Sequence, residues 1–187
     1  MNGFIRVIGG KWRGRKLPVL DNEGLRPTTD RVKETLFNWL MPVIHDANCL
    51  DCFAGSGSLG FEALSRGAKH ATLLEKNRTA AQQLNKNKQL LQIQNGHILQ
   101  TDTINWLASS ADQKFDVVFV DPPFHHGLAS KTIQRLETYD WLSNGAYIYV
   151  ETEQNGLLSR DVPLNWTLHR EKTTGQVHSY LFIRENA

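Results

Sequence analysis

Short apolar runs and longer amphipathic stretches alternate along the chain after residue 47. An apolar run bounded by turn residues is typical of a buried strand, whereas apolar positions three or four apart indicate a helix. On this basis we predict strands over residues 48–53, 70–75, 97–101, 115–120, 145–151, 164–173 and 177–184. Helices are predicted over residues 58–66, 78–91, 103–109 and 130–138. The alternation predicts an α/β fold with a mostly parallel sheet that helices cover on both faces.

The two ends of this pattern predict antiparallel pairs. The last two predicted strands face each other across residues 173–176, which leaves no room for a crossover helix, so we expect them to pair antiparallel. Near the start, residues 4–8 and 16–20 form two short extended segments around glycine-rich turns. They predict a small N-terminal β-hairpin.

A further helix is expected between the hairpin and the first strand of the sheet. Residues 26–30 supply a proline and then capping residues, and Val32, Leu36 and Leu40 follow at every fourth position. Lys33 and Glu34 are predicted to lie on another face of this helix. Because Pro42 follows, the helix should end near Met41.

Charge is distributed unevenly along the chain. The 187 residues hold 21 Lys and Arg against 19 Asp and Glu, but residues 1–33 alone carry eight basic and three acidic side chains. A basic arm on a mildly acidic body indicates a polyanionic partner, for which nucleic acid is the usual candidate. We therefore divide the chain into a basic arm for contact with nucleic acid, residues 1–29, and one domain, residues 30–187.

We expect neither membrane insertion nor secretion. No stretch approaches the roughly 18 consecutive apolar residues of a membrane span, and residues 1–6 lack a continuous apolar signal-peptide core. Cys49 and Cys52 are too few for a disulfide framework. A cytoplasmic location follows as the expectation.

A glycine-rich segment follows the first predicted strand of the sheet. Gly55, Gly57 and Gly60 form G-x-G-x-x-G, and Glu75 ends the second strand 20 residues after Gly55. A carboxylate at that place accepts hydrogen bonds from the ribose of an adenosine cofactor. Asp51 precedes the glycines, where its charge would repel a pyrophosphate and attract an ammonium group, which favours S-adenosylmethionine over a dinucleotide. Asp102, after the third strand, is placed to accept from an adenine amino group.

The motif that decides the chemistry is D-P-P-F at residues 121–124, directly after the fourth strand. Pro122 and Pro123 have no N–H, so the Asp121 carboxylate and the neighbouring carbonyls form a stiff row of acceptors. Such a row complements a nucleobase NH₂ group, whose two N–H bonds it can hold so that the nitrogen lone pair faces an incoming methyl group. Phe124 supplies a face on which the base stacks.

These segments together resemble the RsmD-type 16S rRNA (guanine-N2)-methyltransferases, which are class I S-adenosylmethionine-dependent enzymes. The resemblance extends over residues 6–17, 26–34, 51–68 and 121–124. It implies a Rossmann-like, seven-stranded sheet with an antiparallel last strand, S-adenosyl-L-methionine as cofactor, and methylation of one guanine amine in small-subunit rRNA. Related proteins often have Tyr where this chain has Phe124, so a role for that hydroxyl does not transfer.

Carried over by motif position, the resemblance and the residue patterns together assign three groups of side chains. The predicted cofactor-binding residues are Asp51, Phe53, Gly55, Gly57, Glu75 and Asp102. The predicted catalytic residues, which hold the guanine, are Asp121, Pro122, Pro123 and Phe124. The predicted RNA-binding residues are Arg6, Lys11, Trp12, Arg13, Arg15 and Lys16, with Trp12 either stacking on a base or anchoring the hairpin. The expected partner is 16S rRNA or the assembled small subunit, and the expected state is a monomer.

Other features are assigned to packing or to the surface. Cys49 and Cys52 match C-x-x-C but lack a second pair for zinc, so we predict that they pack in the core and that no metal is bound. His125 and His126 are expected in an exposed loop near the substrate. Arg26, Thr28 and Arg31 are further candidates for the cleft, although helix capping also explains Thr28.

Three other functions fit part of the sequence. An amino methyltransferase for adenine or cytosine in DNA or another RNA would use the same D-P-P-F chemistry. A nicotinamide oxidoreductase would share the glycine loop and Glu75, but Asp51 and the two prolines oppose it. An RNA-binding assembly factor with a vestigial pocket is opposed by the intact set of cofactor residues.

Overall fold

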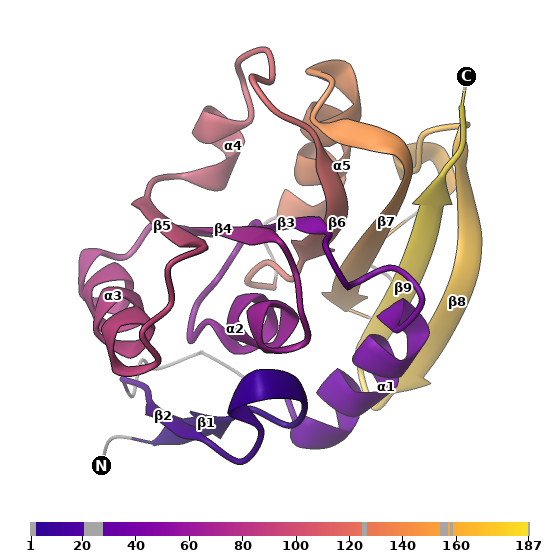
Figure 1. Ribbon diagram of the computed structural model, residues 1–187. Coiled ribbons are helices and arrows are strands. Elements are labelled where there is room, and N and C mark those ends of the chain that lie inside the picture. The colour runs from indigo at the N-terminus through magenta and orange to yellow at the C-terminus, as the bar shows by residue number, and fades with distance from the viewer. Residues whose placement is uncertain (1–2, 21–27, 125–126, 154–156, 158, 187) are drawn as a thin grey trace. The chain divides into compact units, whose positions relative to one another are not determined.

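The computed structural model describes residues 3–20, 28–124, 127–153, 157 and 159–186 (Figure 1). The chain forms two compact units, residues 1–101 and residues 102–187. Among the described residues, no helix is long and apolar enough to cross a membrane.

The first unit begins with the small hairpin. Strands β1 (Phe4–Arg6) and β2 (Lys16–Pro18) pair antiparallel, and the turn η1 (Gly10–Trp12) lies between them. Ile5 and Leu17 point to the buried side, whereas the residues on either side of them in each strand are exposed. This alternation gives the hairpin one buried apolar face and one exposed face, on which Arg6 and Lys16 lie with Phe4 and Pro18.

Helix α1 (Asp30–Leu40) follows the hairpin and confirms the predicted helix. Thr29 caps it by accepting a hydrogen bond from the Val32 N–H, and the helix ends at Leu40, before Pro42. One prediction was wrong: Lys33 is 1% exposed and lies on the buried face with Leu36 and Phe37. The recurrence of apolar residues at every fourth position placed Lys33 on another face. A lysine is rarely buried, and this one is buried because its ammonium group has partners in other elements.

The rest of the first unit is a β-α-β-α-β segment. Strands β3 (Asn48–Asp51), β4 (His70–Glu75) and β5 (Gly96–Gln100) are parallel and lie in the order β5-β4-β3. Helix α2 (Ser58–Ser65) connects β3 to β4, and α3 (Arg78–Leu90) connects β4 to β5. Leu50, Leu73 and Leu74 are fully buried in these strands, as a sheet covered by helices requires.

The second unit holds helices α4 (Thr103–Trp106) and α5 (Leu128–Thr138) with four strands. Strand β6 (Phe115–Val120) pairs parallel with β7 (Leu142–Glu153). Strand β9 (Val177–Arg184) pairs antiparallel with both β7 and β8 (Trp166–Thr174), and the turn η2 (Ser159–Asp161) precedes β8. Trp106 stacks on Trp141 at a centroid distance of 4.5 Å, so these tryptophans serve packing.

The strand order is β5-β4-β3-β6-β7-β9-β8, which confirms a seven-stranded, mostly parallel sheet with an antiparallel last strand. The predicted antiparallel pairing across residues 173–176 and the N-terminal hairpin are also confirmed. The predicted helix over residues 103–109 is shorter, because α4 ends at Trp106. The boundary between residues 29 and 30 stays a prediction.

Candidate active site

The glycine loop lies between the end of β3 and the start of α2. Gly55 and Gly57 have φ angles of +53° and +81°, which favour glycine. A Cβ on Gly57 would lie 2.5 Å from the Phe61 ring, and a Cβ on Gly60 would lie 2.7 Å from Leu73. The first two glycines therefore shape the turn, while the third lets α2 pack closely on β4.

Asp51 ends β3 beneath this loop and is 2% exposed. Its Oδ2 accepts a hydrogen bond from the Gly60 N–H at 3.1 Å, in the first turn of α2. The pKa of the Asp51 carboxyl is raised to about 7, chiefly by burial and also by the nearby Glu75 charge, against the backbone donors of Gly60 and Phe53, which lower it. Asp51 is thus a buried acid that a cation would stabilise in its charged form.

Glu75, at the end of β4, holds the loop in place. Its Oε2 accepts from the Gly55 N–H and its Oε1 from the Asn77 N–H, both at 2.8 Å. Each carboxylate oxygen has a second lone pair, so Glu75 can still accept from a ligand hydroxyl. Its predicted contact with a ligand stays a prediction, and its contact with the loop was not predicted from the sequence.

Ser58, the first residue of α2, is an additional candidate. It is 5% exposed, and its Oγ is a buried side-chain oxygen with no hydrogen-bond partner in the described part of the chain. A buried hydroxyl without a partner is costly, so it indicates a position that a ligand satisfies. Together with Asp51, it fits a ligand that carries both a positive charge and polar groups.

Asp102 and the D-P-P-F segment belong to the second unit. Asp102 caps α4, with its Oδ1 accepting from the Asn105 N–H at 3.0 Å. The D-P-P-F segment follows β6 directly; Asp121 and Phe124 are half-buried, Pro122 is buried and Pro123 is exposed. Asp121 and the Phe124 ring are thus partly accessible at the carboxyl end of a buried strand.

Tyr149 lies on β7, next to the end of β6 from which the D-P-P-F corner, residues 121–124, continues. Its partner in the register is Phe119, and its hydroxyl donates to Glu151 Oε2 at 3.1 Å and lies 3.2 Å from Ser179 Oγ. Burial raises the pKa of the Tyr149 hydroxyl well above its usual value, and the Glu151 and Asp121 charges act in the same direction. Tyr149 therefore stays protonated and faces acidic groups at this end of the sheet.

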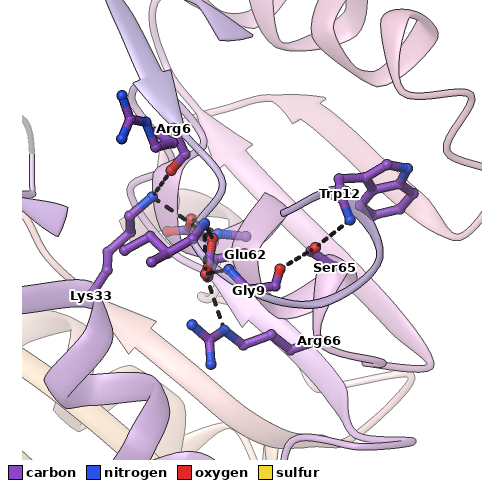
Figure 2. Close-up of polar contacts among 10 residues, drawn as sticks. Arg6, Gly9, Trp12, Lys33, Glu62, Ser65 and Arg66 are labelled. Carbon is purple, nitrogen blue, oxygen red and sulfur yellow. Dashed lines mark hydrogen bonds and ion pairs between the residues drawn. The ribbon is translucent and has the colours of Figure 1, made fainter. Parts of the chain in front are cut away.

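The hairpin is fixed to α2 through a buried glutamate (Figure 2). Glu62 is fully buried, and its carboxylate accepts from the Ile8 and Gly9 N–H groups at 3.0 Å each. Arg66 donates to it at 3.0 Å, and Lys33 Nζ lies 3.8 Å from it while donating to the Arg6 carbonyl. This cluster, the Glu62 anchor, explains why Lys33 is buried.

Ser65 adds a second attachment of the hairpin. Its Oγ donates to the Gly9 carbonyl at 2.6 Å and accepts from the Trp12 N–H at 3.0 Å. A Cβ on Gly10 would lie 1.9 Å from the Ser65 carbonyl, so glycine is required for this approach. The backbone of Trp12 thus anchors the hairpin, while Arg6, Lys11, Arg13, Arg15 and Lys16 are all exposed.

A model of the family described as conserved hypothetical protein 95 matches residues 5–183. Ribosomal RNA small subunit methyltransferase D of Escherichia coli (strain K12) is 57% identical over 185 residues, which cover 98% of this chain and 92% of the relative. Its namesake in Haemophilus influenzae (strain Rd) is 56% identical over 183 residues, covering 96% and 94%. The chain belongs to this family. The predicted resemblance to the RsmD-type methyltransferases is confirmed.

Solved structures of this methyltransferase family agree with the fold. A putative methyltransferase from Escherichia coli matches with a TM-score of 0.91 and 55% identity, covering 98% of this chain and 99% of that chain. The Rossmann-like class I methyltransferase fold is therefore confirmed as well.

The sequence analysis missed the residues of the Glu62 anchor and Ser58. The one available signal for the anchor was the pair Gly9 and Gly10, which indicates close approach of another segment. Arg26, His125 and His126 lie outside the described residues. Cys49 and Cys52 are buried and are not joined by a disulfide; burial, and to a lesser extent the Asp51 charge, raises the pKa of the Cys52 thiol.

Proposed function

We propose that this chain transfers a methyl group from S-adenosylmethionine to the exocyclic N2 amine of one guanine in 16S rRNA. The observation that carries the proposal is the D-P-P-F corner at the end of β6, with a half-buried carboxylate and ring on a backbone that two prolines deprive of donors. The names of its relatives, which are ribosomal RNA small subunit methyltransferases, support the substrate class. An rRNA enzyme of this kind works in the cytoplasm.

The first unit holds the cofactor in this proposal. When bound, S-adenosylmethionine supplies an electrophilic methyl group on a sulfonium centre. The Asp51 carboxylate pairs with the ammonium of its methionine part, Gly55, Gly57 and Phe53 surround that part, and the Ser58 hydroxyl finds its missing partner there. Glu75 accepts from the ribose hydroxyls, and Asp102 accepts from the adenine amine. The buried acid with a raised pKa and the unpartnered serine support this assignment.

Asp121 acts by positioning the amine. A guanine NH₂ group is a weak nucleophile because its lone pair is delocalised into the ring. Asp121 and the main-chain carbonyls hold both N–H bonds, and Phe124 stacks on the base, so that the lone pair points at the methyl carbon. Orientation of this kind contributes up to ~7–11 kcal/mol, more than the ~10²–10⁴-fold of a general base. The proton leaves after transfer, when the nitrogen has become acidic.

The basic hairpin binds the rRNA. Its five cationic side chains are exposed, and the Glu62 anchor fixes the backbone that carries them. Such a preformed surface contacts phosphates and orients the substrate without reading its sequence.

The test compares Asp121→Ala with Asp112→Ala, a change of an exposed acid in the same unit. Asp121→Ala should lower turnover on unmethylated small-subunit rRNA at least ~10²-fold while the affinity for S-adenosylmethionine stays near the wild-type value. Asp112→Ala should match the wild type in both. Wild-type turnover in Asp121→Ala would overturn the role of the corner.

Mass spectrometry of the digested rRNA tests the substrate. N2-methylguanosine at one position is the expected product. Methylated adenine or cytosine, or transfer to DNA but not to rRNA, would instead support the other amino methyltransferases.

A further inference from the structure

Two segments of the first unit carry basic side chains and no acidic ones. Residues 3–20 hold Arg6, Lys11, Arg13, Arg15 and Lys16 without an Asp or Glu. Residues 76–101, which contain α3, hold Lys76, Arg78, Lys86 and Lys88, again without an acid. The two segments are more than 50 residues apart in the sequence, so only the first was predicted to bind RNA.

The fold places α3 beside the hairpin, as Figure 1 shows for α3 and β2. Asn87 of α3 is 1% exposed, and its Nδ2 donates to the Pro18 carbonyl at the end of β2 at 2.8 Å. Gln83, one turn earlier, donates to Asn87 Oδ1 at 3.1 Å and so orients this amide. A buried asparagine thus fastens α3 to the same strand that carries Lys16.

Lys86 and Lys88 lie on either side of this attachment. In a helix, neighbouring residues are about 100° apart, so the side chains next to a buried residue border the buried face. Lys86 is exposed and Lys88 is half-buried. Lys86 and Lys88 therefore border the buried face of α3 on its two sides, next to the residue that contacts the hairpin, and neither segment has an acidic side chain to neutralise them.

We propose that the part of α3 that carries Lys86 and Lys88 is a second part of the rRNA-binding surface. The two lysines contact phosphates of the RNA that the hairpin binds. The inference rests on the proposed function, since it needs rRNA as the substrate. Two segments that carry cations and no acids suit a polyanion, and because Asn87 fixes them to each other they can hold a longer stretch of backbone than the hairpin alone.

The test measures affinity for unmethylated small-subunit rRNA at several salt concentrations. Each phosphate contact contributes about 0.7–0.9 to the slope of log K against log salt concentration. The double variant Lys86→Ala, Lys88→Ala should therefore flatten the slope by about 1.4–1.8. Its melting temperature and its affinity for S-adenosylmethionine should stay at the wild-type values.

Two further variants make the outcome decisive. Lys131→Ala removes an exposed lysine of α5 in the second unit and should leave the slope unchanged. Arg13→Ala, Arg15→Ala tests the hairpin itself and should flatten the slope by a similar amount. If only the hairpin variant changes the slope, the α3 surface is overturned while the proposed function stands. If neither variant changes it, the rRNA-binding role of the hairpin fails too.

Discussion

A buried acid and a buried serine lie near each end of α2, and the two pairs differ in the partners that their side chains have. At the C-terminal end, Glu62 is surrounded by two backbone N–H groups, Arg66 and Lys33, and Ser65 Oγ both donates and accepts. At the N-terminal end, burial raises the pKa of Asp51 to about 7, and Ser58 Oγ has no partner among the described residues.

The difference separates a structural cluster from a binding site. Taking a carboxylate out of water costs several kcal/mol unless cations and hydrogen bonds compensate for it. Glu62 receives that compensation from other residues of its own chain, and its carboxylate oxygens accept hydrogen bonds from the hairpin backbone. Among the described residues Asp51 receives only backbone donors, so the compensation is left for a ligand, and an ammonium group supplies it in the proposed complex.

Removing the compensated acid should have the largest effect. Glu62→Ala leaves Lys33 buried without its carboxylate and leaves the Ile8 and Gly9 N–H groups without their acceptor. We expect the free energy of unfolding to fall by about 3–5 kcal/mol, the usual cost of breaking a buried ion pair, measured by urea denaturation. Glu34→Ala, an exposed acid of α1, is the control and should change it by less than about 0.5 kcal/mol. Equal losses in the two variants would contradict the comparison.

Replacing Asp51, the acid without a compensating cation in the described part of the chain, should instead raise the free energy of unfolding of the cofactor-free protein at high pH. The pKa of Asp51 rises from an unfolded value of 3.8 to about 7, so the folded state holds a proton that the unfolded state has lost between these pH values. Stability from this group is complete below pH 3.8 and is lost as pH rises to about 7. Asp51→Asn should therefore be more stable than the wild type at pH 8, by up to about 4 kcal/mol, and equal to it near pH 3.8.

This second prediction is read from denaturation curves of both proteins, without cofactor, across that pH range. A difference that does not depend on pH would show that the asparagine acts through packing and that Asp51 does not titrate in this window.

The same substitution, Asp51→Asn, should weaken the binding of S-adenosylmethionine. At pH 8 the charged Asp51 pairs with the ammonium of S-adenosylmethionine, and Asp51→Asn should bind about 10–100-fold more weakly, since charge-assisted hydrogen bonds contribute about 1.5–3 kcal/mol. As pH falls through about 7, Asp51 becomes protonated and the ratio of the two affinities should shrink, by about tenfold at pH 6. Calorimetric titration of both proteins gives the ratio and removes the cofactor's own titration. A ratio that stays constant would exclude pairing with the carboxylate.

The two serines should give the smallest effects. Ser58→Ala removes an unsatisfied hydroxyl, so we expect unchanged or slightly higher stability and about 2–10-fold weaker binding of S-adenosylmethionine. Ser65→Ala removes two hydrogen bonds to the hairpin and should lower the free energy of unfolding by about 1–2 kcal/mol with unchanged cofactor affinity. Thermal denaturation with and without cofactor measures both. If the two variants exchange these effects, α2 does not divide the roles as described.

Much of the fold could be predicted because its signals are local. The predicted bounds of β4, β6 and β9 agree with the structure, since each is an apolar run between turn residues, and the start of α1 follows from Thr29 as its cap. The short α4 was overestimated because the apolar residues after Trp106 continue the pattern beyond the helix.

The candidate site could be predicted in outline only. The motifs named Asp51, Glu75 and the corner at Asp121, because glycines and prolines change the backbone in ways that can be read from the sequence. Lys33 and Glu62 could not be recognised, since each alone is an ordinary helix residue and their meaning depends on a hairpin segment 54 positions from Glu62. The same holds for Asn87, whose partner Pro18 is 69 positions away.

The order of strands and helices, the glycine turn and the donor-free corner follow from the sequence, because they depend on neighbouring residues and on the backbone angles that glycine and proline allow. Which buried charges are compensated was decided only by the tertiary structure. Compensation depends on distances between segments remote in the chain, and it is what distinguishes the acid that holds the hairpin from the acid that is left for a ligand.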